Sequence, residues 1–392
     1  MPRQRWALLG LLVIGLLVRV AFLVNTSGNP FDLHSMQVVR GHLVSSRPLH
    51  VYSDSNAHET FLRWPYPPGY FPVLVVAGKL ASLTDSAFTD VVRVAPVIAD
   101  LLITMIVFLA LRSRGERTAL AGAALVALGP SFIANSGVHG QIDAVAGLFV
   151  LLSVLAWERD DPHRAVQAGL LLGLAASVKT VPALFVLALL PTARDLRERV
   201  TVLVAAAAVP ILALAPFVLS DAHGVVTAFR YRGLPGLGGL SMLAQPSLAA
   251  SWLSAEPLHE SGVTSHLQSV STLFALIGVL ATAVVLWRRR LPAGVGVAAI
   301  ALAVWTFGVN YALGYVLWAL PVIILAGWLW QAAALQAVLV VPTILVESIH
   351  HVGGYSHRTA YAVYVPLMLV VLAGYVLGWI RLLRLPATPQ GA

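Results

Sequence analysis

Long apolar runs separated by short polar segments make up most of this chain. A helix needs about 20 apolar residues to cross the ~30 Å hydrocarbon core of a bilayer. Twelve segments reach or approach this length, and we predict that each forms a membrane-spanning helix. Those between 143 and 192 are short, which predicts tilted or broken spans. The twelve are 6–24, 90–111, 118–136, 143–157, 165–178, 180–192, 199–219, 268–287, 292–309, 313–330, 332–347 and 360–380.

The composition is that of a membrane protein. Of 392 residues, 58% are hydrophobic and 11% are charged, and the mean hydropathy is +0.84. These values predict an all-α polytopic membrane protein. The first run follows Arg3 and Arg5, as in a signal peptide, but it carries Arg19 and no small-x-small cleavage site follows, so we interpret it as an uncleaved span. Cysteine is absent, which excludes disulfides and thiol chemistry.

Basic residues indicate the topology. A net charge of +8 would suggest nucleic-acid binding in a soluble protein, but here the arginines cluster in short loops, so we predict no nucleic-acid partner. With a cytoplasmic N-terminus, cytoplasmic segments hold 15 of the 25 basic residues. The positive-inside rule then predicts a multi-pass plasma-membrane protein with both termini cytoplasmic. The fifteen are Arg3, Arg5, Arg112, Arg114, Arg117, Arg159, Arg164, Arg194, Arg197, Arg199, Arg288, Arg289, Arg290, Arg381 and Arg384.

The apolar segment 70–84 decides this topology. Counted as a span, it would move the basic loop 112–117 outside and invert every later loop. As a helix lying in the outer interface, it keeps the charge pattern, and Lys79 can extend to water. We therefore predict an interfacial helix and two long external loops, 25–89 and 220–267. Long ordered loops usually carry function.

Polar side chains gather between the third and fourth spans. His139, Gln141 and Asp143 lie there at a membrane edge, where such groups are costly unless they face a polar cavity. An N-cap by Asp143, with a turn at Gly137 and Gly140, would account for the carboxylate and the glycines. It would leave His139 and Gln141 unexplained, so a binding role is favoured.

Lys179 lies between two short spans, and a lysine in mid-membrane costs about 3 kcal/mol on insertion scales. An anionic partner would compensate this cost, either Asp143 or a ligand phosphate. Asp100, in the second span, is a further candidate partner or a purely structural residue.

Asp32 follows the first span, and Pro30 ends the extended stretch before it. The sequence predicts a short helix over 33–43 with Asp32 near its N-terminus, where the helix dipole stabilises a carboxylate. A simple N-cap is the plainer interpretation of Asp32 taken alone.

Two further candidates lie in the long loops. Tyr66, in the aromatic and proline-rich turn 64–69, either anchors the chain at the headgroups or lines a groove for a sugar or lipid. Arg230 and Arg232 form either an anion clamp or part of a solvated loop.

The histidines of the first long loop recur every eight residues, which does not return to one helical face. We therefore predict no metal site from them. They are His34, His42, His50 and His58.

In order and spacing, these residues resemble the GT-C superfamily of membrane glycosyltransferases. The resemblance rests on Asp32, Tyr-Pro-Pro at 66–68, His-Gly-Gln-Ile-Asp at 139–143 and Lys-Thr-Val-Pro at 179–182. It is closest to bacterial polyprenyl-phosphate-mannose-dependent mannosyltransferases, family 87 or related. It covers about 1–220, which implies a catalytic transmembrane module there that includes loop 25–89. Loop 220–267 and C-terminal transmembrane helices make up 221–392.

The resemblance implies that Asp32 is catalytic, that a polyprenyl-phosphate sugar is the donor, and that the reaction inverts the anomeric centre. Membrane lipid and a glycolipid or glycan acceptor are the other expected partners, and no cofactor is expected. Family members often carry two acidic residues close together in this loop. Here Leu33 and His34 follow Asp32, so the resemblance gives no basis for a divalent metal.

The residue types fit this chemistry independently. An ionised aspartate can take the proton of an acceptor hydroxyl, and Lys179, His139 and loop arginines can stabilise a leaving phosphate. Gln141, Asp143, Tyr66 and Arg230 complete the candidate donor- and acceptor-binding set. The alternative is a transporter or flippase of a lipid-linked sugar or small polar solute, because intramembrane polar groups suit transport equally. Against it, no internal repeat is visible.

Overall fold

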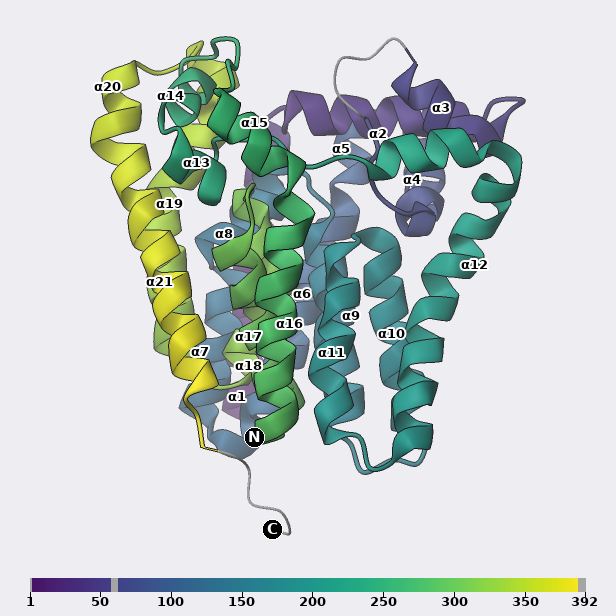
Figure 1. Cartoon of the computed structure of the whole chain (residues 1–392), viewed down its shortest axis with the longest axis vertical. Coiled ribbons are helices and arrows are strands. Elements are labelled where there is room, and N and C mark those ends of the chain that lie inside the picture. Colours follow the sequence, from purple (N-terminus) through teal and green to yellow (C-terminus); the bar gives the residue numbers. More distant parts are fainter. Residues whose placement is uncertain (1, 58–62, 387–392) are drawn as a thin grey trace. The chain divides into compact units, whose positions relative to one another are not determined.

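The computed structural model describes residues 2–57 and 63–386, which form helices and no strands (Figure 1). The predicted all-α fold is therefore confirmed. The chain divides into two compact units. The first comprises Met1–Leu128, Phe132–Val186 and Arg194–Tyr231, and the second comprises Gly129–Ser131, Leu187–Ala193 and Arg232–Ala392.

The first unit contains both long and short helices. They are α1 (Pro2–Asn25), α2 (Pro30–Leu43), α3 (Val51–Asn56), α4 (Phe71–Thr84), α5 (Phe88–Val92), α6 (Val94–Leu111), α7 (Glu116–Ala127), α9 (Asp143–Trp157), α10 (Arg164–Val178) and α12 (Leu196–Phe229). Short 3₁₀ segments occupy Pro48–His50, Pro68–Tyr70, Arg112–Arg114 and Val181–Phe185, and a π-helical turn occupies Ala134–His139. Two short helices lie where the chain passes between the units: α8 (Pro130–Ile133) and α11 (Val186–Leu189).

Seven of the twelve predicted spans are long and apolar enough to cross a membrane. They are Gln4–Asn25, Phe88–Arg114, Glu116–His139, Leu196–Phe229, Ser271–Arg289, Leu329–Ile349 and His357–Leu383. Four more form shorter apolar helices: Asp143–Trp157, Arg164–Val178, Val181–Thr192 and Ala293–Phe307. The last, predicted at 313–330, is broken into the 3₁₀ segment Leu313–Trp318 and a short α-helix. At 15 residues each, α9 and α10 are about 22 Å long, so the prediction of short spans in this region is confirmed.

Glycines allow α10 to pack closely against α12. Gly169 and Gly173 are spaced as in a small-xxx-small motif, which lets helix backbones approach in a membrane. A Cβ on Gly169 would lie 2.6 Å from the Cβ of Ala205, and one on Gly173 would lie 2.8 Å from the carbonyl oxygen of Ala206. Neither position has room for a side chain, so the helix pair depends on both glycines.

A buried ion pair joins α1 to α6. Arg19 Nε lies 3.0 Å from Asp100 Oδ2, and both side chains are fully buried. The same guanidinium donates to the carbonyl oxygens of Gly15, Val126 and Ala127, at 3.0, 3.1 and 2.6 Å. The guanidinium is thus well satisfied, which offsets part of the cost of burying the pair, whereas Asp100 Oδ1 is buried without a hydrogen-bond partner among the described residues. Asp100 is thus the partner of Arg19 and not of Lys179, so it is a structural residue.

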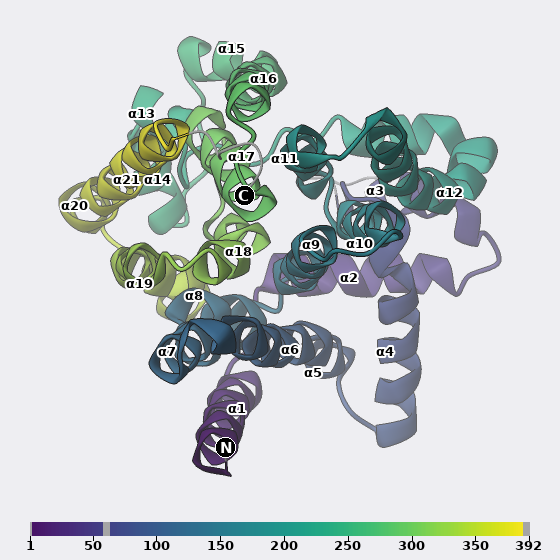
Figure 2. The ribbon, with the colours of Figure 1, turned by 90° about the horizontal axis from the view of Figure 1, so that it is seen from below.

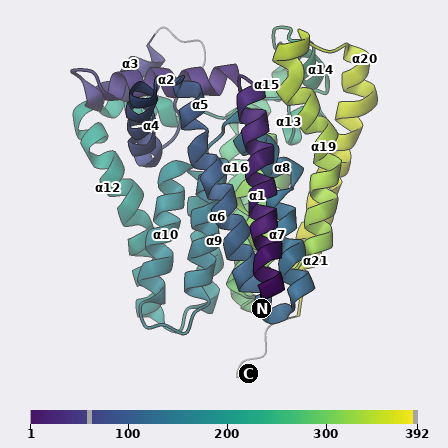
Figure 3. The same ribbon diagram turned by 180° about the vertical axis from the view of Figure 1, so that it is seen from behind.

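Two helices of the first unit lie across its long helices. In Figures 1 and 3, α2 runs across the ends of α9 and α10 while α4 is seen nearly end-on, and Figure 2 shows α4 along its length. The buried face of α4 consists of Phe71, Leu74, Ala77, Gly78 and Ala81. The large apolar side chains on its other face are exposed: Val75, Val76, Leu80 and Leu83. The segment 70–84 therefore forms a helix with one buried face and one exposed apolar face, and its position in the interface stays a prediction.

The second unit has its own core. Its helices are α13 (Leu240–Ala244), α14 (Ser247–Leu253), α15 (Gly262–Ser269), α16 (Ser271–Arg289), α17 (Ala293–Phe307), α18 (Leu320–Leu325), α19 (Leu329–Val352), α20 (His357–Thr359) and α21 (Val365–Leu383), with 3₁₀ segments at Leu190–Thr192 and Leu313–Trp318 and a π-helical turn at Ala360–Tyr364. Polar bonds within it join α21 to its neighbours. The Tyr311 and Tyr375 hydroxyls lie 2.6 Å apart, and Trp379 Nε1 donates to Thr282 Oγ1 at 2.8 Å.

Candidate functional site

Asp32 is the third residue of α2, and it does not cap the helix. The N-cap is Asn29, whose side-chain oxygen accepts from the backbone N–H groups of Phe31 and Asp32, both at 3.1 Å. Pro30 occupies the first helical position, where its missing N–H costs nothing. The simple N-cap interpretation of Asp32 is therefore wrong, and its carboxylate is available for other contacts.

Two side chains from the turn before α9 meet this carboxylate. His139 Nε2 lies 2.6 Å from Asp32 Oδ2, and Gln141 Nε2 donates to the same oxygen at 2.7 Å. The side chain of Asp32 is 25% exposed and that of His139 is 17% exposed. The predicted residues Asp32, His139 and Gln141 thus come together across 107 residues of sequence, at a half-buried position.

A π-helical turn presents these two side chains. The segment Ala134–His139 is π-helical, a form that is frequent at functional sites. Gly140 follows it with φ +83°, which favours glycine. The backbone N–H groups of Gly140 and Gln141 both donate to the carbonyl of Asn135, at 2.9 and 3.0 Å. The backbone N–H of Asn29 donates to the carbonyl of His139 at 3.0 Å, which fixes the turn to the start of α2.

Lys179 and Asp143 form a second layer of the site. Lys179 Nζ lies 3.4 Å from Asp143 Oδ1, and each side chain is 3% exposed. Asp143 begins α9 without capping it, and its other oxygen accepts from Asn135 Nδ2 at 3.3 Å. Lys179 also donates to Gln141 Oε1 at 3.4 Å. Of the partners considered from the sequence, Lys179 therefore pairs with Asp143.

Tyr66 supplies an aromatic wall. Lys179 Nζ lies 3.9 Å from the centroid of its ring, a cation–π contact. Burial raises the pKa of the Tyr66 hydroxyl well above its usual value, and the negative charges of Asp32 and Asp143 raise it further. Trp64 packs edge-on against Tyr66 and is only 2% exposed, so it belongs to the core rather than to a headgroup anchor.

Electrostatics keep Asp32 ionised. Burial alone would raise the pKa of its carboxyl group. The hydrogen bond and charge interaction with His139, the charge of Lys179 and the hydrogen bond from Gln141 together lower that pKa below its usual value of 3.8. Asp32 is therefore a carboxylate at neutral pH.

Several supporting residues were not expected from the sequence. Arg93, fully buried, donates to the carbonyls of Leu23 and Thr26 at 2.9 and 3.0 Å, and its side chain packs against Gly140. It thus ties the end of α1 to the turn that carries His139. Asn29 could have been found, because Asn before Pro at a helix start is a readable cap signal. No local pattern marks Arg93.

Arg230 lies at the end of α12 with an exposed side chain, next in sequence to Tyr231. Burial and the charge of Asp32, partly offset by the charge of Lys179, raise the pKa of Tyr231 to about 12, which places Tyr231 near the site. His58 lies outside the described residues. Among the residues that are described, no group of three or more His, Cys, Asp or Glu could hold a metal ion.

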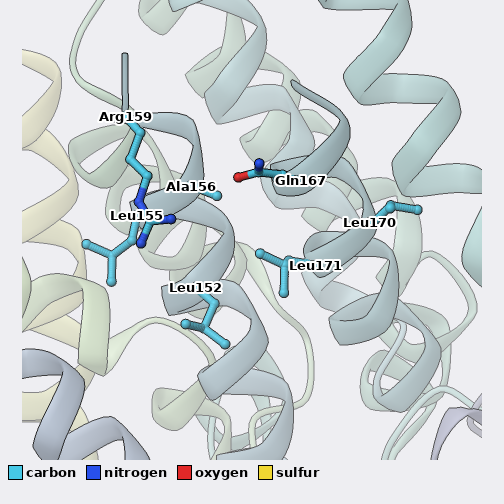
Figure 4. Close-up of a pocket in the computed structure, with 7 residues that line it drawn as sticks. All are labelled: Leu152, Leu155, Ala156, Arg159, Gln167, Leu170 and Leu171. Carbon is cyan, nitrogen blue, oxygen red and sulfur yellow. The ribbon is translucent and has the colours of Figure 1, made fainter. Parts of the chain in front are cut away.

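A groove of about 330 Å³ opens elsewhere in the first unit, between α9 and α10 (Figure 4). Its walls are mainly apolar, with Arg159 and Gln167 among the lining residues. The lining residue of α9 nearest to the site in sequence is Leu152, nine residues after Asp143, so the groove begins about 14 Å along α9 from the site. The groove is therefore separate from the cluster around Asp32.

Comparisons with known proteins agree with this arrangement. A model of glycosyltransferase family 87 matches residues 64–309, more than half of the chain. The chain belongs to glycosyltransferase family 87. The matched region includes Tyr66, His139 and Lys179, whereas Asp32 precedes it. No curated protein matches the sequence.

Two crystal structures of ArnT from Cupriavidus metallidurans are similar to this family-87 member. The structure bound to undecaprenyl phosphate is 15% identical with a TM-score of 0.50, over 96% of this chain and 76% of that one. The apo structure is 16% identical with a TM-score of 0.47, over 98% of this chain and 77% of that one. At such low identity, the similarity to the undecaprenyl-phosphate-bound structure shows a shared fold and no more. The expected GT-C membrane fold is confirmed.

Proposed function

We propose that this family-87 member transfers a hexose, with mannose as the first candidate, from a polyprenyl-phosphate donor to a lipid-linked or glycan acceptor on the outer face of the membrane. Asp32 acts as the general base. The observation that carries the proposal is the distribution of hydrogen bonds on its carboxylate. His139 and Gln141 both contact Oδ2, and no hydrogen bond among the described residues reaches Oδ1. An ionised carboxylate oxygen without an internal hydrogen bond is what an acceptor hydroxyl requires.

The transfer is a single displacement. The acceptor oxygen forms a bond to the anomeric carbon while its proton passes to Asp32 Oδ1. The bond from that carbon to the phosphate oxygen breaks, and the polyprenyl phosphate leaves with the electron pair. Because attack and departure occur on opposite faces of the sugar, the configuration inverts. His139 and Gln141 hold Oδ2, so Asp32 is oriented before the acceptor arrives.

The leaving phosphate requires positive charge or hydrogen-bond donors. Arg230 is exposed and immediately precedes Tyr231, whose pKa is raised by the charge of Asp32, so its backbone lies close to the same site. An arginine can bind phosphate through two parallel hydrogen bonds. We propose Arg230 as a donor-phosphate ligand.

A lipid-borne donor fits the position of the site. Tyr66 leads directly into the 3₁₀ turn Pro68–Tyr70 and the interfacial helix α4, whose outer face is apolar. The structural neighbour ArnT has been crystallised with undecaprenyl phosphate. Membership of a glycosyltransferase family favours transfer over the alternative of transport.

The test is Asp32→Asn in purified protein, with synthetic undecaprenyl-phosphate mannose as the probe donor. The change keeps size and shape but removes the base, so kcat should fall by about 10²–10⁴-fold. Donor KM and the melting temperature should change little, because Asn29 and not Asp32 caps α2.

Asp54→Asn is the matched control, since Asp54 is another acidic residue of the same external loop, with a side chain 24% exposed and 3.9 Å from Arg47. Its kcat should stay near wild type. Normal turnover by Asp32→Asn would move the base to another carboxylate. Failure of the wild-type protein to transfer from this donor would reject the proposed donor.

A further inference from the structure

Lys179 is surrounded on three sides. Its Nζ contacts Asp143 Oδ1 at 3.4 Å, Gln141 Oε1 at 3.4 Å and the face of Tyr66 at 3.9 Å. An ammonium group has three N–H donors, and each has an acceptor or an aromatic face in these contacts. The residue is 2% exposed. Lys179 is therefore already satisfied by this chain.

These contacts fix the orientation of the Gln141 amide. Its oxygen accepts from Lys179 Nζ at 3.4 Å and from the backbone N–H of Ile142 at 3.1 Å. Two donors on the oxygen require the amide nitrogen to point the other way, toward Asp32 Oδ2 at 2.7 Å. With the amide reversed, its nitrogen would face two donors and its oxygen would face a carboxylate. Lys179 and the Ile142 N–H together therefore favour the amide orientation that holds Asp32.

We infer that Lys179, neutralised by Asp143, is a positioning residue that orients the Gln141 amide and so holds the catalytic carboxylate of Asp32. This inference rests on the proposed role of Asp32 as the base. It differs from a role of Lys179 in binding the donor phosphate, which the sequence left open. Because Asp143 compensates its charge within the protein, Lys179 offers little net attraction to a second anion.

The charges of the pair also act on Asp32 in opposite directions. Lys179 favours the ionised form of Asp32, and removing it should make Asp32 easier to protonate. Removing the negative charge of Asp143 leaves the lysine uncompensated, so Asp32 should become harder to protonate. A purely packing role for Lys179 would not produce shifts of opposite sign.

The first experiment needs no substrate. Lys179→Met and Asp143→Asn proteins are treated with a water-soluble carbodiimide between pH 3 and pH 7, and labelling of Asp32, which requires the protonated carboxyl, is followed by mass spectrometry. The labelling midpoint should rise by about one pH unit in Lys179→Met and fall in Asp143→Asn. Lys79→Met is the matched control, because Lys79 is the other lysine and is exposed on α4. Its midpoint should equal that of wild type.

Lys179→Met alone leaves Asp143 buried without its cation, which can unfold a protein. The double variant Lys179→Met/Asp143→Asn removes both charges and avoids this problem. Its labelling midpoint should return close to wild type. With undecaprenyl-phosphate mannose as donor, its kcat should still be about 10-fold lower, because Gln141 has lost one of its two orienting donors, while donor KM stays unchanged.

Equal midpoints in wild type, Lys179→Met and Asp143→Asn would overturn the inference. So would a large rise in donor KM with unchanged kcat in the double variant, because that result marks a phosphate ligand. An inactive wild-type protein would reject the proposed donor instead, and the labelling midpoints would still decide whether the pair acts on Asp32.

Discussion

The carboxylate of Asp32 has two oxygens in different surroundings. Oδ2 is held by His139 and Gln141, and the side chain remains 25% exposed. In the proposed mechanism one oxygen fixes the orientation of the group while the other meets the acceptor. The contacts also lower the pKa of Asp32, so its carboxylate stays ionised as the pH falls below neutrality.

This leads to a prediction for His139→Ala. Asp32 acts in its ionised form, so activity is present above its pKa and is lost as the pH falls through it. The contacts with His139 lower that pKa, and removing them should raise it. The acidic limb of the kcat/KM profile should therefore move up by about one pH unit or more. His34→Ala, an exposed histidine on the same helix, should leave the profile unchanged.

An unshifted acidic limb in His139→Ala, with activity reduced equally at all pH values, would contradict the electrostatic role of His139. It would indicate instead that the imidazole only holds Asp32 in place.

At this scale the sequence predicted which polar side chains belong to one cluster but not how they are joined. The cost of polar groups at a membrane edge was enough to select His139, Gln141, Asp143 and Lys179. Lys179 pairs with Asp143 and not with Asp100 because of how α6, α9 and α10 are turned about their own axes. No local sequence pattern encodes this.

The helices of the first unit are arranged by small residues and by helix ends. The contact of α10 with α12 depends on Gly169 and Gly173, and the site itself lies where α10 ends and α9 begins. The end of α10 places Lys179 in an extended conformation, φ −140° and ψ 137°. The positions of Lys179 and Asp143 therefore follow from the packing of these helices.

The closeness of α10 and α12 predicts the effect of Gly173→Ala. The new Cβ would lie 2.8 Å from the carbonyl oxygen of Ala206 and 2.9 Å from the Cβ of Val209. Overpacking of this kind costs about 1–3 kcal/mol, so the melting temperature of the detergent-purified protein should fall by several degrees. Gly10→Ala in α1 is the matched control, because nothing lies within 4 Å of its Cβ. Equal melting temperatures for the two variants would contradict the close packing.

The elements were largely predictable, and their departures have physical causes. Apolar run length predicted the spans, and the charge pattern predicts that α4 lies in the interface. The π-helical turn before α9 was not predicted, because its bonds depend on the chain folding back at Gly140. The break within the predicted span 313–330 likewise has no signal in hydropathy.

At the scale of the whole chain, the distribution of arginine predicts orientation. Two contacts within the first unit agree with one basic side: Gln4 bonds to Glu116 at 2.9 Å, and Arg164 pairs with Glu198 at 2.6 Å. The N-terminal end of α1 therefore contacts the start of α7, and the start of α10 contacts the start of α12.

Single cysteines test this orientation cleanly in a chain without native cysteine. Ser113→Cys, in the loop after α6, should resist an impermeant maleimide added to intact cells and react after lysis. Ser46→Cys, exposed in the first long loop, should react in intact cells. The reverse pattern would invert the topology and place Asp32 on the cytoplasmic face.

The buried pair of Arg19 and Asp100 has a consequence for biogenesis. The two residues are 81 positions apart, so at 5–20 residues per second the arginine is synthesised roughly 4–16 s before its partner. During that interval the first span carries an uncompensated charge and is a poor anchor by itself. It must wait beside the translocon, or let its guanidinium extend to the interface, until the span with Asp100 arrives. The two helices then enter the lipid as a neutral pair, and assembly of the enzyme begins with that release.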